Sequence, residues 1–114
     1  YQEGGSAEFD AGIKEYINGN SEALAANGGN DTISAVTAMG YDAYFVALEA
    51  MKKADSGDKA ALMQILPSVT YTGVSGSIAF DEIGDAVRDT AYIKTADTGA
   101  GVWMLETVQT GSGN

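Results

Sequence analysis

The fold is set by the segment Gly73-Val74-Ser75-Gly76-Ser77-Ile78-Ala79-Phe80-Asp81-Glu82-Ile83-Gly84-Asp85. Its first part alternates with a period of two, as a half-buried strand requires, and this places on one face Val74, Gly76, Ile78 and Phe80. Its last part, Asp81 to Asp85, is an acidic turn that reverses the chain. The segment therefore predicts a strand with one face against the core and a tight connection to the next strand.

Two further alternating runs follow this segment. They cover residues 87–94 and 102–108 and are separated by a turn at Asp97 to Gly101. Short connections of this kind join antiparallel neighbours. We expect a three-stranded antiparallel meander, and after it a flexible tail at Gly111–Asn114.

Upstream of the strands the hydrophobic period is helical, and three helices are expected. The first covers about residues 6–17, with Ser6 as its N-cap and Asn18-Gly19 as its stop. A loop rich in Asn and Gly then continues to Thr32, with one helical turn at residues 21–26. The third helix has its N-cap at Asp55 or Ser56 and ends at Pro67.

The second predicted helix, residues 34–54, is apolar around most of its circumference. Asp42 and Glu49 are its only charged residues before Lys52 and Lys53. A helix of this kind must be buried on nearly every side, and one short helix with a few strands cannot cover it. The chain is therefore expected to expose apolar surface and to form a homodimer or larger oligomer, with an interface near Tyr44, Phe45, Leu48 or Trp103.

The composition limits the possible partners and chemistries. The 114 residues suffice for one core, and they carry 16 acidic and 6 basic side chains, which gives a net charge of −10. Such a surface repels phosphate, so neither nucleic acid nor an anionic membrane is expected as a partner. The chain has no His and no Cys, the residues of the usual zinc, copper, haem and thiol chemistries, and no apolar run long enough to span a membrane.

Two glycine-containing turns invite ligand hypotheses. The acidic turn Asp81–Asp85 could supply oxygens to calcium, but it lacks the ligand spacing of an EF-hand loop. We expect an ordinary turn in which Asp side chains bind backbone N–H groups and Gly84 is left-handed. Gly99-Ala100-Gly101 resembles the start of a dinucleotide fingerprint, but it has no third glycine and no following helix, so a hairpin turn is expected.

Carboxylates and aromatic side chains are the remaining candidates for a site. Asp42 and Glu49 lie one heptad apart and could do acid–base chemistry, but no nucleophile and base occur as a pair. Because Asp42 lies in an apolar stretch, we expect it to be hydrogen-bonded to a neighbouring loop. Four aromatic side chains could stack on a ligand, but we expect core positions for Tyr41 and Tyr44 and positions on a sheet face for Tyr92 and Trp103.

The order of these elements resembles the C-terminal part of type I periplasmic (extracytoplasmic) solute-binding proteins, the leucine/isoleucine/valine-binding family of ABC importers. Gly40-Tyr41-Asp42-Ala43 matches the Tyr-Asp-Ala that opens a helix in that family, and residues 73–85 match its G-x-x-G-x-I-x-F-D-x-x-G-D strand and turn. Phe9 and Tyr16 match a preceding F-x-x-x-Y helix loosely. The resemblance covers roughly residues 7–108, whereas a family member is much longer and two-lobed, so the chain looks like a fragment.

The resemblance implies an α/β parent, of which residues 1–110 would be a partial lobe and 111–114 a tail. Its implied function is that of a solute-binding component of an ABC transporter, which captures a branched-chain or other small amino acid, or an amide-like solute, for a permease in the membrane. The implied location is extracytoplasmic, either in the periplasm or anchored as a lipoprotein. No enzyme activity and no cofactor are implied.

No catalytic, ligand-binding or metal-binding residue is assigned to this chain, because the family's ligand residues come mostly from segments N-terminal to the matched part. An alternative stays open at this point. The same two-lobed architecture serves as the ligand-binding sensor domain of receptors, and only sequence beyond this chain separates a sensor from an importer.

Overall fold

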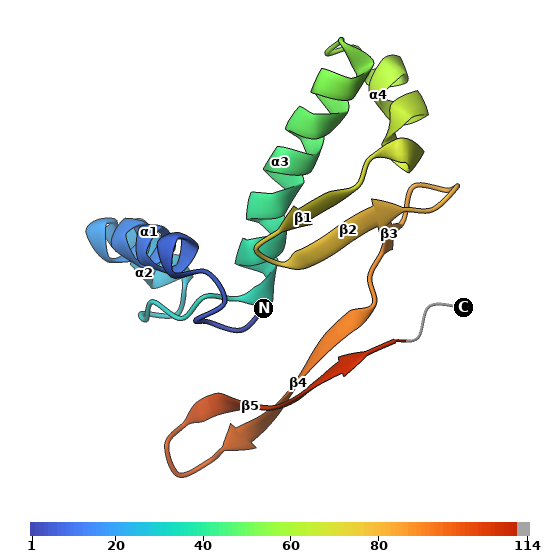
Figure 1. The fold of residues 1–114 in the computed structure, drawn as a ribbon. Helices are drawn as coiled ribbons and strands as arrows, with labels where there is room; N and C mark the ends of the chain where they lie inside the picture. The colour runs from blue at the N-terminus through green and yellow to red at the C-terminus, as the bar shows by residue number, and fades with distance from the viewer. Residues whose placement is uncertain (112–114) are drawn as a thin grey trace.

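The computed structural model describes residues 1–111, and within them a helical half is followed by a β half (Figure 1). The helices are α1 (Ala7–Gly19), α2 (Ser21–Ala26), α3 (Ala35–Ala54) and α4 (Lys59–Ile65), with a 3₁₀ turn, η1, at Leu66–Ser68. The strands are β1 (Tyr71–Gly73), β2 (Gly76–Phe80), β3 (Ala86–Val87), β4 (Thr90–Asp97) and β5 (Val102–Thr110). The predicted order of elements, helices followed by antiparallel strands, is confirmed. The single three-stranded meander is wrong, because the strands form two sheets, β1-β2-β3 and β4-β5.

Ser6 caps α1 as predicted, and the second long helix, α3, begins where it was expected. Ser6 Oγ accepts a hydrogen bond from the Phe9 N–H at 3.4 Å, and Ser34 Oγ accepts one from the Thr37 N–H at 3.1 Å. The expected helical turn at residues 21–26 is α2. Tyr41 lies in the second turn of α3 rather than at its start, unlike the Tyr-Asp-Ala that opens a helix in the family.

The predicted N-cap of the third helix is wrong. Asp58 caps α4, since its carboxylate accepts from the N–H groups of Ala60 and Ala61 at 3.0 and 3.2 Å. Asp55 instead ends α3 in a left-handed conformation with φ 49°. The N-cap of α4 therefore lies two or three residues beyond the predicted positions, because Asp55 ends one helix and cannot begin the next.

The strand boundaries also differ from the prediction. The chain reverses at Val74 and Ser75, so β2 begins only at Gly76 and pairs with β1, a strand that was not predicted from the sequence. The predicted strand at residues 87–94 is split, because β3 pairs with β2 whereas β4 pairs with β5. The side chain of Arg88, between β3 and β4, donates to Ser75, and the chain leaves the first sheet at this point.

The core consists of two clusters on either side of the β1–β2 turn. The first contains Tyr1, Phe9, Ile33 and Ala38, with Ile13 and Val74 packed against it. The second contains Val46, Ala50, Val69 and Ile78, with partly buried side chains around it, including Leu62, Ile65, Leu66 and Phe80. Ile78 and Phe80 therefore pack inward as predicted, whereas Val74 belongs to the other cluster.

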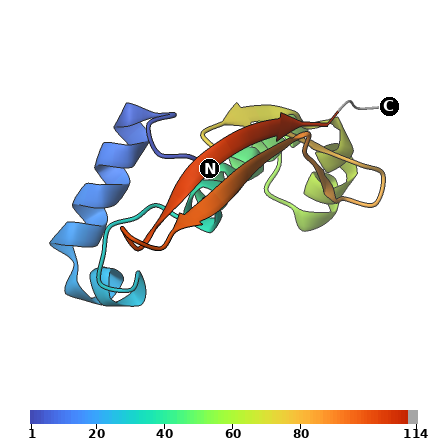
Figure 2. The same cartoon turned by 90° about the horizontal axis from the view of Figure 1, so that it is seen from below.

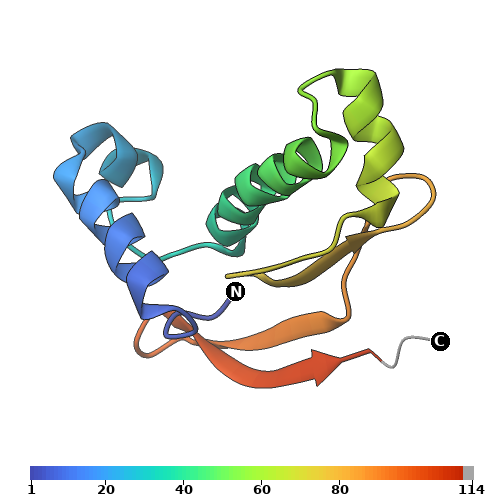
Figure 3. The same cartoon turned by 45° about the horizontal axis from the view of Figure 1, so that its top comes forward.

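Much of the rest of α3 and nearly all of the second sheet are exposed. Tyr44 and Val36 on α3 are 63% and 74% exposed, which confirms that the chain leaves apolar surface of this helix uncovered. Figure 3 shows α1 and α2 on one side of α3, and α4 with β1 and β2 on the other. We call β4 and β5 the arm; Figure 1 shows it apart from the first sheet, the view from below shows it as a long curved ribbon in front of the other elements (Figure 2), and its strands pack chiefly on each other.

The molecule is consequently extended. Its radius of gyration is 16.6 Å, against about 13 Å for a compact domain of this length. Among the described residues, no helix has the length and apolar character needed to cross a membrane. Gly111 donates a backbone hydrogen bond to the Asp89 carbonyl, and the rest of the expected flexible tail lies outside the described residues.

Candidate functional site

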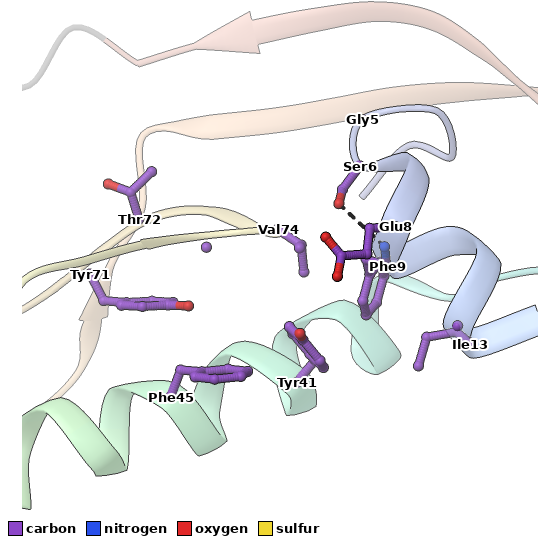
Figure 4. A pocket seen from close by; sticks show the side chains of 12 residues that line it. Gly5, Ser6, Glu8, Phe9, Ile13, Tyr41, Phe45, Tyr71, Thr72 and Val74 are labelled. Carbon is purple, nitrogen blue, oxygen red and sulfur yellow. Dashed lines mark hydrogen bonds between the residues drawn. The ribbon is translucent and has the colours of Figure 1, made fainter. Parts of the chain in front are cut away.

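An open groove of about 770 Å³ lies between α1, α3 and the β1–β2 turn (Figure 4). We call it the aromatic groove, because its side chains are mostly rings or aliphatic groups. Its lining residues are Gly5, Ser6, Glu8, Phe9, Gly12, Ile13, Tyr41, Phe45, Tyr71, Thr72, Gly73 and Val74. Three elements that are distant in the sequence thus contribute to one concave surface.

The rings along the groove form a continuous series. The centroid of Tyr41 lies 4.9 Å from that of Phe9 and 4.9 Å from that of Phe45. The rings of Phe45 and Tyr71 are parallel within 5°, with centroids 6.2 Å apart. These spacings are those of favourable aromatic pairs. Tyr41 and Phe45 are neighbours because residues four apart share one face of a helix.

The electrostatic character of the groove is negative. Glu8 is its only charged lining residue, and among residues 1–111 this carboxylate forms no salt bridge. Burial raises the pKa of the Tyr71 hydroxyl above its usual value, and the nearby charges of Asp42 and Glu49 add to the shift. A phenol whose pKa is raised by carboxylates lies in a negative field, which disfavours its ionised form.

Asp42 lies directly behind the wall of the groove and is fully buried. Its carboxylate accepts hydrogen bonds from the backbone N–H groups of Val74 at 3.0 Å and Ser75 at 2.7 Å, and from the Ser75 hydroxyl. The expectation that Asp42 binds a neighbouring loop is confirmed. The fit is close, because a Cβ on Gly73 would lie 2.1 Å from Asp42 Oδ1, so this position must be glycine.

Arg88 extends this network toward the arm. Its guanidinium donates to the Ser75 carbonyl and to Ser75 Oγ, both at 3.0 Å. A buried carboxylate is costly unless it is hydrogen-bonded and its charge compensated. Asp42, Ser75 and Arg88 therefore form a structural link between α3, the β1–β2 turn and the start of the arm.

The structure separates the two carboxylates considered for acid–base work. Asp42 faces the β1–β2 turn, whereas Glu49 forms a salt bridge of 2.7 Å with Lys52. Both glycine-containing turns are ordinary turns, as predicted. Asp81 Oδ1 accepts from the N–H groups of Ile83 and Asp85, and Asp97 Oδ1 accepts from those of Gly99 and Ala100. Within residues 1–111, no group of three or more acidic side chains is placed to hold a metal ion.

The four aromatic candidates are dispersed. Tyr41 lines the groove and is 42% exposed, and Tyr44 is 63% exposed, so the core positions predicted for these two residues are wrong. The reason is that the described elements leave these parts of the α3 surface exposed. Tyr92 and Trp103 lie on the arm, as predicted, and Trp103 is 71% exposed.

The groove itself was not predicted from the sequence. Phe9, Glu8 and Tyr71 belong to it, and nothing local in the sequence connects them. The only available signal was the pair Tyr41 and Phe45, which share one helix face. Comparisons of the chain with protein-family models, curated proteins and solved structures found no match.

Proposed function

We propose that this chain is the C-terminal part of one lobe of a type I extracytoplasmic solute-binding protein that serves an ABC importer. The observation that carries the proposal is the Asp42 network. The resemblance rests on two motifs, Gly40-Tyr41-Asp42-Ala43 and residues 73–85. A hydrogen bond from the Val74 N–H to the Asp42 carboxylate joins them, although these two residues are 32 positions apart in the sequence. A chance match of two short motifs gives no reason for them to meet.

The open surface of the chain also supports the proposal. A lobe of the proposed parent would include further strands to cover α3, and this helix carries an uncharged exposed side with Val36, Tyr44 and Met51. Soluble monomers rarely leave such apolar patches open. An isolated two-stranded ribbon is marginally stable in water, so the arm is expected to pack against residues outside this chain.

The proposed mechanism is stoichiometric capture. Two lobes close on a branched-chain or other small amino acid, or an amide-like solute, and the closed protein delivers it to a membrane permease outside the cytoplasm. No bond is made or broken in this cycle. The role of the present residues is to form part of one lobe and the connection toward the hinge.

The test compares two proteins by calorimetric titration with leucine, isoleucine, valine and a panel of other amino acids. The complete product of the gene that encodes these residues is expected to give a saturable heat for at least one amino acid. This chain alone is expected to give none, because a cleft between two lobes cannot form from one partial lobe. Absence of binding to every amino acid by a folded complete product would overturn the proposal.

A further inference from the structure

We infer that the aromatic groove binds a small organic cation, such as a substituted ammonium group with an apolar tail. The inference goes beyond solute capture by two lobes, because the groove is formed entirely by residues of this chain. Figure 4 shows the rings of Tyr41, Phe45 and Tyr71 on one side and Phe9 with the carboxylate of Glu8 on the other.

The first argument is the chemistry of the rings. Aromatic faces carry negative electrostatic potential, and a cation within about 6 Å of a ring centroid is attracted to it. Phe9, Tyr41 and Phe45 follow one another at 4.9 Å, and Tyr71 lies 6.2 Å beyond Phe45. Phe9 itself is buried in the core, but a cation placed over Tyr41 and Phe45, whose centroids are 4.9 Å apart, is within reach of both rings.

The second argument is the charge around the rings. No lysine or arginine of the described chain lines the groove, and Glu8 at its rim has no cationic partner there. Asp42 lies behind Gly73 in the wall, and the only cation in its network, Arg88, is held at Ser75 outside the lining. The whole chain carries a net charge of −10, which raises the local concentration of cations further.

The third argument is size and selectivity. The volume of about 770 Å³ lies within the range of small-molecule sites, roughly 300–1,000 Å³, and exceeds that of a bare ammonium group. The groove therefore has room for an apolar tail on the cation. A zwitterionic amino acid would bring a second carboxylate into this negative field, so amino acids are disfavoured here relative to a simple cation.

The first test uses the unmodified protein and two probes of equal shape. Choline carries a quaternary nitrogen, and 3,3-dimethyl-1-butanol has a neutral carbon in its place. Nuclear magnetic resonance titration is expected to show saturable shifts of the groove's ring resonances with choline, at least about five-fold tighter than with the neutral alcohol. Equal affinity for the two probes, or no saturable shift with choline, would overturn the inference.

Matched variants then locate the site. Tyr41→Leu removes a ring of the groove, whereas Tyr44→Leu removes an exposed ring of the same helix that does not line it. Choline affinity is expected to fall about five-fold or more in Tyr41→Leu and to stay unchanged in Tyr44→Leu. Circular dichroism verifies the fold of both. Equal effects of the two substitutions in folded protein would contradict a site in the groove.

A second matched pair of variants tests the contribution of the Glu8 carboxylate. Glu8→Gln keeps the size of the side chain at the rim, and Glu15→Gln removes a charge from the same helix away from the groove. Choline binding is expected to weaken about three-fold in Glu8→Gln and less in Glu15→Gln, because a charge attracts most strongly at short distance. Equal losses would indicate attraction to the general acidic surface and would overturn the groove as the site.

Discussion

Asp42 is the residue on which most of the local structure depends. It is fully buried, and its two oxygens accept all three hydrogen bonds that hold the β1–β2 turn against α3. The sequence predicted a hydrogen-bonded Asp42 because a carboxylate in an apolar stretch must find donors. It could not predict Ser75 and Arg88 as the next members of the network, since their contribution depends on the path of the chain.

Asp42→Asn is expected to lower the free energy of unfolding by about 2 kcal/mol, because an amide group has one oxygen and would turn its NH₂ toward a backbone N–H. Urea denaturation followed by circular dichroism measures this. Asp85→Asn is the control, since Asp85 is exposed and a surface substitution changes stability by about 0.5 kcal/mol or less. Equal stability of the two variants would mean that Asp42 does not hold the turn.

Tyr1 gives a prediction for alkaline pH. Burial raises its pKa to about 12 from the ordinary 10.0, and the hydrogen bond to Asp10 with the charge of that carboxylate adds to the shift. The folded state therefore holds the phenol proton more tightly than the unfolded state, and the stabilisation is complete below pH 10 and lost as the pH rises toward 12.

Urea denaturation at a series of pH values between 9 and 12 measures how the free energy of unfolding changes with pH, and so tests the raised pKa of Tyr1. Stability is expected to fall across the window, and Tyr1→Phe is expected to reduce the slope. A slope unchanged by Tyr1→Phe would mean that the other tyrosines cause the whole dependence.

At the scale of elements, helices were predictable and short strands were not. Ser6 was predicted as an N-cap because capping is decided by neighbouring residues. The three residues of β1 are too few to show an alternation. The split between β3 and β4 was hidden as well, since it depends on the contact between Arg88 and Ser75 rather than on hydrophobic period.

The inner face of β2 carries the prediction at this scale. Ile78→Ala is expected to lower the free energy of unfolding by about 2–4 kcal/mol, because Ile78 is buried against the cluster of Val46, Ala50 and Val69. Ser77→Ala on the opposite, exposed face is expected to have little effect. Thermal and urea denaturation compare the two. A larger loss from Ser77→Ala would mean that the faces of β2 are assigned the wrong way round.

At the scale of the whole molecule, the sequence predicted the incomplete cover of α3 but not the aromatic groove. The incomplete cover of α3 could be predicted because few charged residues occur along this helix. The aromatic groove could not, because it depends on the tertiary contacts of α1, α3 and β1. An extended shape with a radius of gyration of 16.6 Å leaves Tyr44 and Trp103 largely in water. Burying apolar surface of this kind is the main driving force of association.

Self-association is therefore expected, and a twofold dimer is the commonest closed form. The net charge of −10 opposes it through repulsion between copies, so added salt is expected to favour the oligomer. Tyr44→Ser is expected to reduce association, because it removes the ring from the uncovered side of α3. Thr37→Ser on the same helix is the control, since it leaves the apolar side chains in place.

The central claim is that the exposed apolar side chains of α3 and the arm need a partner surface to bury them. Size-exclusion chromatography coupled to light scattering tests this claim most directly, because it measures the mass of the particle in solution. At high protein concentration the account predicts the mass of a dimer or a larger oligomer, with a lower mass for Tyr44→Ser. A clean monomer mass of 11.7 kDa under these conditions would contradict it, because the chain would then tolerate its open helix and arm without a partner.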